Sequence, residues 1–206
     1  MTKHALLGVI VTIAATTCFA QQYGSLKDAR DGRIYKTVKI GEQVWMAENL
    51  NADRFRNGDT IFEAKSEEEW RLAGKLAKPA WCYFENEVKN KVIFGKLYNR
   101  YALTDPRGLA PLGFEFACDH DWMRIIYKNK SQLNSILGVA LGGFRDDGYA
   151  DGKHEFIGLN EEIKWWSSTG MVSWDLKSFN VDFANGDWDY DNSGFYVRCV
   201  KYVIKH

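Results

Sequence analysis

Apolar and polar positions alternate most clearly in residues 31–51 (DGRIYKTVKIGEQVWMAENLN). Positions 34–40 combine β-branched, aromatic and lysine residues with a period of two, which predicts a strand. Gly41-Glu42 predicts a tight reversal, and residues 43–46 return as a second strand, so the segment is expected to form a hairpin. We interpret Trp45 and Met46 as core residues.

Glu48 and Asn49 leave this hairpin beside Leu50. Their carboxylate and amide suit hydrogen bonds to the backbone of a neighbouring loop, and this is the role that we expect. A catalytic role for Glu48 is the alternative interpretation.

Three later segments have helical features. Residues 66–75 begin with a serine and a glutamate in capping-box spacing. Residues 95–103 (GKLYNRYAL) carry apolar side chains at helical spacing and predict a short amphipathic helix. Another helix is expected to begin at Cys118, with Asp119 or Asp121 as its cap. Its apolar stripe consists of Trp122, Ile125 and Ile126.

The remaining segments predict short strands separated by polar loops. Buried strands are expected at 136–144 and 165–169, an alternating strand at 178–184 and a closing strand at 195–203. Asn185-Gly186 is a strong hairpin signal. The pattern therefore predicts an α+β domain in which two helices pack on short, twisted antiparallel strands with long loops.

The first 20 residues have a different pattern. A short positive start at Lys3 and His4 precedes an apolar run, which ends in the small-x-small sequence Cys18-Phe19-Ala20. This predicts a secretory signal peptide over 1–20, cleaved after Ala20. A membrane anchor is one alternative, although the run is shorter than the roughly 20 apolar residues of a span. A lipoprotein attached through Cys18 is the other, although Thr17 fits that pattern poorly.

Cleavage would leave 21–30 as an extended lead-in and 31–206 as a single domain. The 206-residue chain has 27 basic and 27 acidic residues, 46% hydrophobic residues and 15% aromatic residues. This composition predicts a compact folded domain. Because no basic stripe is present, nucleic acid is excluded as the expected partner. No transmembrane segment is expected after signal cleavage.

Export would place the cysteines in an oxidising compartment, where one disulfide is expected among Cys82, Cys118 and Cys199. The residues alone do not choose the pair. Their spacing excludes CxxC redox or zinc patterns, and the four histidines are scattered. No cofactor is therefore expected, apart from the calcium considered below.

Several segments together resemble the Fibrobacter succinogenes major paralogous domain, which occurs in secreted and surface proteins of Bacteroidetes-type bacteria. The order and spacing of these segments are kept from residue 31 to residue 201. The segments are DGRIYKTVKIGEQVWMAENLN, GKLYNRYAL, the helix at Cys118, LGGFRDDGYADG, WWSST and SGFYVRCVK. One segment departs: residues 118–122 keep the cysteine and tryptophan of the family's usual Cys-Pro-x-Gly-Trp-His-x-Pro run but lack both prolines.

The resemblance implies a C-type-lectin-like fold, distantly similar to formylglycine-generating enzymes. In such folds the first and last strands are neighbours, so the hairpin would lie beside residues 195–203. The resemblance also implies a disulfide between Cys118 and Cys199, which would leave Cys82 free and buried.

Two clusters of acidic residues are candidate metal sites. Asp187, Asp189 and Asp191 alternate, so a strand would place their carboxylates on one face, and calcium favours such oxygen ligands. A solvated hairpin face is the simpler interpretation. A second, weaker candidate consists of Asp146, Asp147 and Asp151.

Aromatic side chains in the late loops suggest a carbohydrate platform. Trp174, Trp188 and Tyr190 could stack on the apolar face of a sugar while nearby carboxylates and amides bind its hydroxyl groups. Core packing is the alternative for each ring. The usual lectin sugar motifs Glu-Pro-Asn and Trp-Asn-Asp are absent from the sequence.

An enzymatic role is not expected, because the chain lacks the closely spaced cysteines of formylglycine-generating enzymes and shows no catalytic triad. The sequence favours an exported, noncatalytic module, secreted or in the cell envelope, that binds a carbohydrate or envelope glycan. The alternatives are a structural or protein-interaction module of the envelope with an envelope protein as partner and, last, an enzyme. Function is expected to lie in the loops between Arg145 and Gly194.

Overall fold

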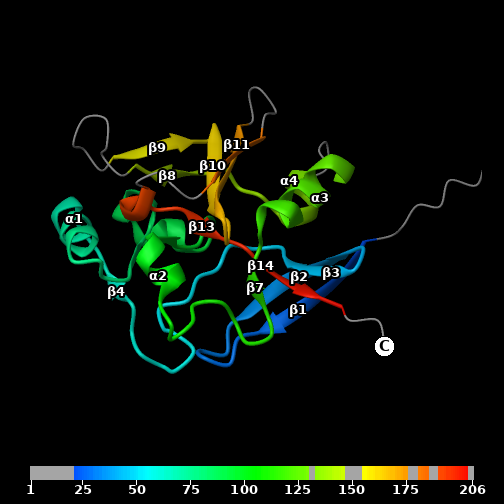
Figure 1. Cartoon of the computed structure of the whole chain (residues 1–206), viewed down its shortest axis with the longest axis horizontal. Coiled ribbons are helices and arrows are strands. Elements are labelled where there is room, and N and C mark those ends of the chain that lie inside the picture. Colours follow the sequence, from blue (N-terminus) through cyan, green and yellow to red (C-terminus); the bar gives the residue numbers. More distant parts are fainter. Residues whose placement is uncertain (1–20, 130–132, 147–154, 176–180, 186–189, 204–206) are drawn as a thin grey trace, which may run out of the picture.

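A computed structural model describes residues 21–129, 133–146, 155–175, 181–185 and 190–203 (Figure 1). The predicted signal peptide lies outside these residues. The described part combines short helices with open sheets, so the predicted α+β class is confirmed. No described helix is both long and apolar enough to cross a membrane.

The opening hairpin lies in a sheet of five described strands, and every neighbouring pair in it is antiparallel. In spatial order these strands are β1 (Gln22–Lys27), β2 (Ile34–Ile40), β3 (Gln43–Met46), β14 (Cys199–Tyr202) and β7 (Glu115–Phe116). Gly41 makes the hairpin turn at a φ of 62°, in the left-handed region that glycine tolerates. The predicted hairpin is therefore confirmed.

A second sheet lies above the first in Figure 1. Its main path is β12 (Val181–Asn185), β11 (Gly170–Asp175), β10 (Glu162–Trp166), β8 (Gly142–Arg145) and β9 (Phe156–Leu159), and β13 (Tyr196–Val197) also pairs with β10. Two of its pairings, β10 with β8 and β10 with β13, are parallel, which the predicted antiparallel set did not include.

The remaining described elements form a small third sheet, four helices and three 3₁₀ turns. They are the small sheet of β4 (Phe62–Glu63), β5 (Ala80–Cys82) and β6 (Leu97–Tyr98), the helices α1 (Glu67–Lys75), α2 (Arg100–Thr104), α3 (Asp119–Asn129) and α4 (Leu133–Leu137), and the 3₁₀ turns η1 (Phe84–Asn86), η2 (Val88–Lys91) and η4 (Tyr190–Asn192). The predicted helix starts at Ser66 and Cys118 are confirmed. The Ser66 hydroxyl accepts from the Glu69 N–H, and the Asp121 carboxylate accepts from the Cys118 N–H.

The last segment of the chain connects the two large sheets. β13 pairs with β10 in one sheet, and β14 pairs with β3 in the other, with Val200 opposite Trp45. The expectation that the hairpin lies beside the closing strand is therefore confirmed. Arg198 is the single residue between β13 and β14, so it lies where the chain passes from one sheet to the other.

Three tryptophans join the sheets to α3. The Trp122 ring of α3 lies 5.0 Å from Trp45 of the hairpin, edge to face, and 4.8 Å from Trp165 of β10, stacked. All three side chains are buried. Aromatic contacts of this kind bury large apolar areas, so this cluster is where the hairpin, the helix and the second sheet close on one another.

Three predicted elements are wrong in their bounds. The strand expected over 165–169 is β10, which begins at Glu162 and ends at Trp166. The helix expected over 95–103 is confined to α2, because Leu97 and Tyr98 pair with β5 and Asn99 caps the helix by accepting from the Ala102 N–H. The strand expected over 136–144 begins only at Gly142, because residues 133–137 form α4. Apolar runs of this length do not distinguish a buried strand from a buried helix.

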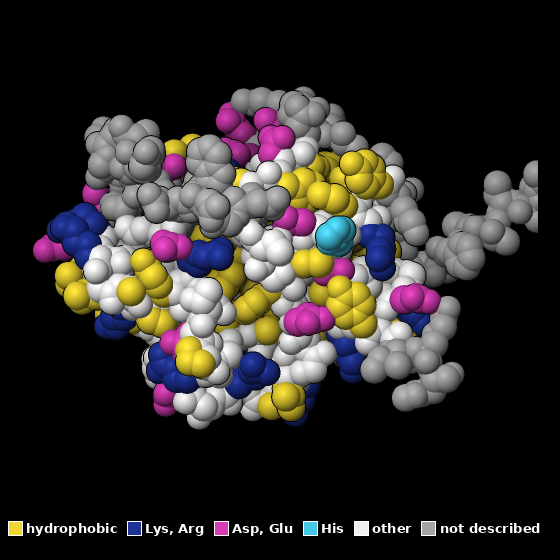
Figure 2. All heavy atoms as spheres, in the orientation of Figure 1, with side chains coloured by type: hydrophobic (Ala, Val, Ile, Leu, Met, Phe, Trp, Pro, Cys, Tyr) yellow, Lys and Arg dark blue, Asp and Glu magenta, His cyan; other side chains and the backbone are white. Residues whose placement is uncertain are grey.

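The surface carries both charge signs. Figure 2 shows lysine and arginine side chains interspersed with aspartate and glutamate over the visible face. This mixture agrees with the net charge of zero, and the exclusion of nucleic acid stays a prediction.

The tryptophan cluster makes a stability prediction. We expect Trp122→Ala to lower the free energy of unfolding by about 3–5 kcal/mol, because it removes a fully buried ring from between two sheets. Tyr127→Ala is the matched control, since Tyr127 belongs to the same helix but is 85% exposed. Urea unfolding measures both variants, and equal losses would contradict this role for Trp122.

Candidate functional site

A polar pocket lies at the exit of the opening hairpin. Its volume is about 270 Å³. Loop 91–95 and the residues after α4 complete its walls. Its polar lining residues are Arg33, Glu48, Asn49, Asn51, Lys91 and Arg198. Five of these six come from segments that the sequence marks as characteristic, the opening stretch and the SGFYVRCVK closing strand.

Two glycines bring the walls of the polar pocket close to the hairpin exit. Gly95 and Gly138 have φ angles of 81° and 58°, both in the left-handed region. A Cβ atom on Gly95 would lie 3.1 Å from the Asn49 side chain, and one on Gly138 would lie 2.9 Å from the Ala47 carbonyl oxygen. The pocket therefore depends on glycine at both positions.

A buried arginine forms the base of the polar pocket. Arg198 is 1% exposed. Its Nε donates to Asn49 Oδ1 over 2.6 Å, and its Nη1 donates to the carbonyl oxygens of Met46 and Leu137 over 3.0 and 2.7 Å. Leu137 is the last residue of α4, and such terminal carbonyls carry partial negative charge. All these acceptors are formally neutral.

Asn49 connects four parts of the chain. Its Oδ1 also accepts from Trp165 Nε1 over 3.0 Å, and its Nδ2 donates to the Phe94 carbonyl over 2.8 Å. The expectation that this amide binds the backbone of a neighbouring loop is confirmed. Glu48 behaves similarly, since its carboxylate accepts from the Lys36 N–H over 3.3 Å in the adjacent strand.

The charges around the polar pocket are mostly positive. Glu48 Oε1 lies 3.9 Å from the Lys36 ammonium, and Asp31 lies 3.6 Å from Arg33 Nε. Arg198 has no carboxylate within ion-pair distance among the described residues, and burial lowers its pKa to about 9 although Glu48 acts in the opposite direction. The guanidinium therefore remains charged at neutral pH.

Two buried polar atoms at the pocket, Asn51 Oδ1 and Arg33 Nε, have no hydrogen-bond partner in the described structure. Asn51 is 5% exposed and donates through Nδ2 to the Lys91 carbonyl over 3.1 Å, but its buried Oδ1 accepts no hydrogen bond. An unsatisfied buried acceptor costs about 1–3 kcal/mol, which a donor group in the pocket would recover. Val92 and Ile93, 90% and 62% exposed, form an apolar rim.

Lys96 lies next to this region in loop 92–96. Its ammonium sits 3.7 Å above the Trp81 ring and 4.0 Å from Asp53, and the side chain is almost fully buried. Burial lowers the pKa of Lys96 to about 8, although Asp53 favours the charged form. Lys96 thus adds to the positive charge near the pocket at neutral pH.

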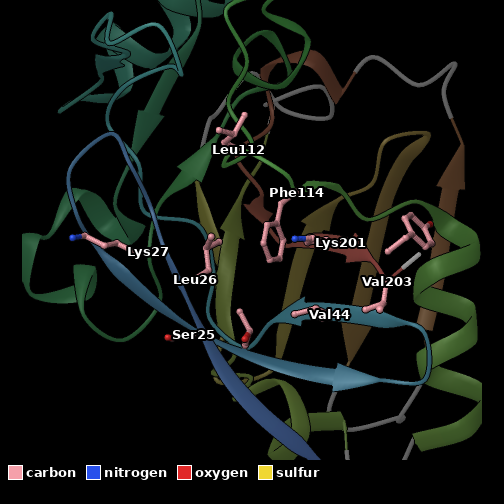
Figure 3. A pocket seen from close by; sticks show the side chains of 10 residues that line it. Ser25, Leu26, Lys27, Val44, Leu112, Phe114, Lys201 and Val203 are labelled. Carbon is pink, nitrogen blue, oxygen red and sulfur yellow. The ribbon is translucent and has the colours of Figure 1, made fainter. Parts of the chain in front are cut away.

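A second hollow, the sheet groove, lies over the five-stranded sheet (Figure 3). Its volume is about 570 Å³, and it is broad and open. Aliphatic and aromatic side chains such as Leu26, Val44 and Phe114 line it together with Lys27 and Lys201. The sheet groove lacks the converging buried polar groups of the polar pocket.

Most of the residues predicted for calcium lie outside the described residues. Asp187 and Asp189 lie outside the described residues, as do Asp147 and Asp151 of the second acidic cluster. Asp191 belongs to η4 and forms an ion pair with Arg100 over 3.5 Å. No group of three possible metal ligands occurs among the described residues. Calcium binding therefore stays a prediction.

The predicted aromatic platform is only partly described. Trp188 lies outside the described residues, and Tyr190 belongs to η4. Trp174 does not serve as an exposed platform ring: it is 2% exposed, as the core-packing alternative predicts. Trp174 lies on β11 opposite Ile163, and strand alternation directs it into the same apolar cluster as Val172.

The predicted disulfide is not formed. Cys82, Cys118 and Cys199 are all free thiols. In the sheet Cys199 stands opposite Phe116, so Cys118 lies two residues beyond the paired position. Diagonal neighbours of this kind are about 7–8 Å apart, farther than the Cα separation of a disulfide. The expectation that Cys82 is free and buried is confirmed.

Comparison with known proteins gives one match. Residues 38–136 match the family described as the Fibrobacter succinogenes major domain. The matched range includes most of the hairpin, the loop over the polar pocket and α3. Neither a curated protein nor a solved structure matches the chain significantly.

The cysteines make a chemical prediction. Burial raises the pKa of Cys82 to about 11 and that of Cys199 to about 12, so both stay protonated and enclosed. We expect Ellman's reagent to label only Cys118 in the native protein. In denaturant without reductant it should count all three thiols, in addition to Cys18 where the leader is retained. A count two lower would show that two of these cysteines are joined by a disulfide in solution.

The Asn49 network makes a second stability prediction. Asn49→Ala should lower the free energy of unfolding by about 2–5 kcal/mol, because it leaves Arg198 Nε and Trp165 Nε1 buried without their acceptor. Asn51→Ala is the matched control. It should change stability by less than about 1 kcal/mol, since it removes one hydrogen bond and one unsatisfied acceptor together. Similar losses in thermal unfolding of both variants would contradict the assignment.

Proposed function

We propose that this chain, whose residues 38–136 match the Fibrobacter succinogenes major domain family, is an exported, noncatalytic module that binds a glycan in the polar pocket. The location would be the cell envelope or the medium. We also propose a C-type-lectin-like fold, supported by the two predicted helices α2 and α3, the short antiparallel strands and the adjacency of β3 and β14.

The observation that carries the proposal is the convergence of an amide, a carboxylate and guanidinium groups on one small hollow. A volume of about 270 Å³ suits a single small polar group of a ligand, such as one sugar unit. Glu48 and Asn51 Oδ1 offer acceptors for hydroxyl groups, and Arg33 offers donors. The exposed Val92 and Ile93 can cover an apolar sugar face.

The noncatalytic part of the proposal rests on the chemistry of the lining. No serine, threonine, cysteine or histidine lines the pocket among the described residues. Tyr35 is present, but burial raises the pKa of its hydroxyl, which accepts a hydrogen bond from the Asn51 N–H. The Arg198 guanidinium and the Asn49 amide are held in place by the fold and have little freedom to take part in a reaction.

A protein-interaction module of the envelope is the second candidate. Strand β1 is exposed along most of its length and pairs only with β2 among the described strands. An edge of this kind offers unpaired backbone groups to an extended peptide from a partner.

A glycan array tests the proposed function directly. We expect the purified protein to bind at least one glycan class, with and without calcium, and Asn51→Ala to abolish binding while the protein remains folded. Leu112→Ala is the matched control, because Leu112 is 78% exposed and lines the sheet groove instead. An array without any binding would contradict the glycan proposal. Binding lost in Leu112→Ala but kept in Asn51→Ala would move the site to the sheet groove.

A further inference from the structure

We propose that the glycan unit held in the polar pocket carries a carboxylate, as a uronic acid does. This inference rests on the proposed function and specifies the ligand of the same site. It follows from three observations on the described residues: a buried cation with no carboxylate at ion-pair distance, an excess of positive groups around the pocket, and a buried acceptor beside them that receives no hydrogen bond.

The first observation concerns Arg198. A fully buried charge is normally paired, because its removal from water is costly. Here Nε and Nη1 are bound by neutral oxygens, and Nη2 has no acceptor among the described residues. The guanidinium nonetheless lines a pocket that reaches solvent. An anionic group placed there would supply the missing counter-charge with a charge-assisted hydrogen bond.

The second observation concerns the groups that face the pocket. Glu48 is its only lining carboxylate among the described residues, and Lys36 lies against it. Lys91 lines the pocket and has no ion-pair partner in the described part of the chain. Arg33 Nε donates no hydrogen bond, although Asp31 lies 3.6 Å away. The positive charge of the nearby Lys96 is offset in part by the Asp53 carboxylate, 4.0 Å away. The balance of charges around the pocket is therefore positive and favours the binding of an anion.

The third observation separates a sugar acid from a simple anion. The Asn51 Oδ1 atom is an acceptor, and it requires a donor. Acetate has none, whereas a uronic acid presents hydroxyl groups together with its carboxylate. The carboxylate would lie toward Arg198, Lys91 and Arg33, and a hydroxyl toward Asn51. The apolar rim of Val92 and Ile93 would lie against the ring carbons.

Isothermal titration calorimetry with monosaccharides tests this inference. The probes are glucuronate and galacturonate, their neutral counterparts glucose and galactose, and acetate and inorganic phosphate as simple anions. We expect a uronate to bind at least tenfold more tightly than its neutral counterpart, and its affinity to fall as salt is added.

Two variants with opposite expectations and one control variant accompany the titration. Lys91→Gln should weaken uronate binding about fivefold, and Glu48→Gln should strengthen it by a similar factor, as expected for one charge near 4 Å in a water-like medium. Lys89→Gln is the matched control: Lys89 lies on the same 3₁₀ turn, 4.0 Å from Glu87, and does not line the pocket. The affinity of the Lys89→Gln variant for the uronate should be unchanged.

The outcomes distinguish the two proposals. Equal binding of neutral and acidic sugars, insensitive to both charge variants, would overturn the carboxylate inference and leave the glycan proposal standing. Acetate or phosphate binding as tightly as the uronates would overturn the sugar-acid assignment in favour of a simple anion site. If no monosaccharide binds in the titration and no glycan binds on the array, the proposed function itself is overturned. Preference for a uronate with opposite shifts in the two variants would support the inference.

Discussion

The hydrogen bond from Arg198 to Asn49 is the contact on which the two sheets depend. Arg198 occupies the one position between β13 and β14 where the chain leaves one sheet for the other, and its charge is buried there. Asn49 accepts from it and from Trp165 of the second sheet, while its amide nitrogen holds loop 91–95. A single side chain thus fixes the hairpin exit, the crossover and the pocket wall relative to one another, which is why the polar pocket occurs at this point of the fold.

Local patterns were sufficient to predict the hairpin, the helix at Cys118 and the α+β class. These features follow from periodicity, turn glycines and caps, all of which act over a few residues. The same reasoning was wrong where tertiary pairing decided the outcome. Leu97 and Tyr98 have helical spacing, but hydrogen bonds to β5 hold them in a strand, and only the residues after Asn99 form the helix. Propensity is a weak preference that such pairing overrides.

The candidate site could be predicted only in part, because it is built from contacts distant in sequence. Glu48 and Asn49 were correctly assigned to backbone binding, but their neighbour Arg198 is separated from Asn49 by about 150 positions and has no local signal. Trp174 lies near a polar loop in the sequence, which favours the platform role, whereas strand alternation turns it inward. A disulfide inferred from resemblance failed for a similar reason: Phe116, and not Cys118, has the register position opposite Cys199.

The buried guanidinium also explains why overall composition is uninformative about this site. A net charge of zero is an average over the surface, where Lys36 and Glu48 or Lys65 and Glu63 lie close together in water. Such exposed ion pairs contribute little to the free energy of unfolding. Arg198 differs because the acceptors that bind it among the described residues are neutral oxygens, so the fold retains a charge that a hydrophobic residue of similar size would avoid. Because this cation lies at the base of an open pocket rather than sealed in the core, we expect its charge to favour an anionic ligand.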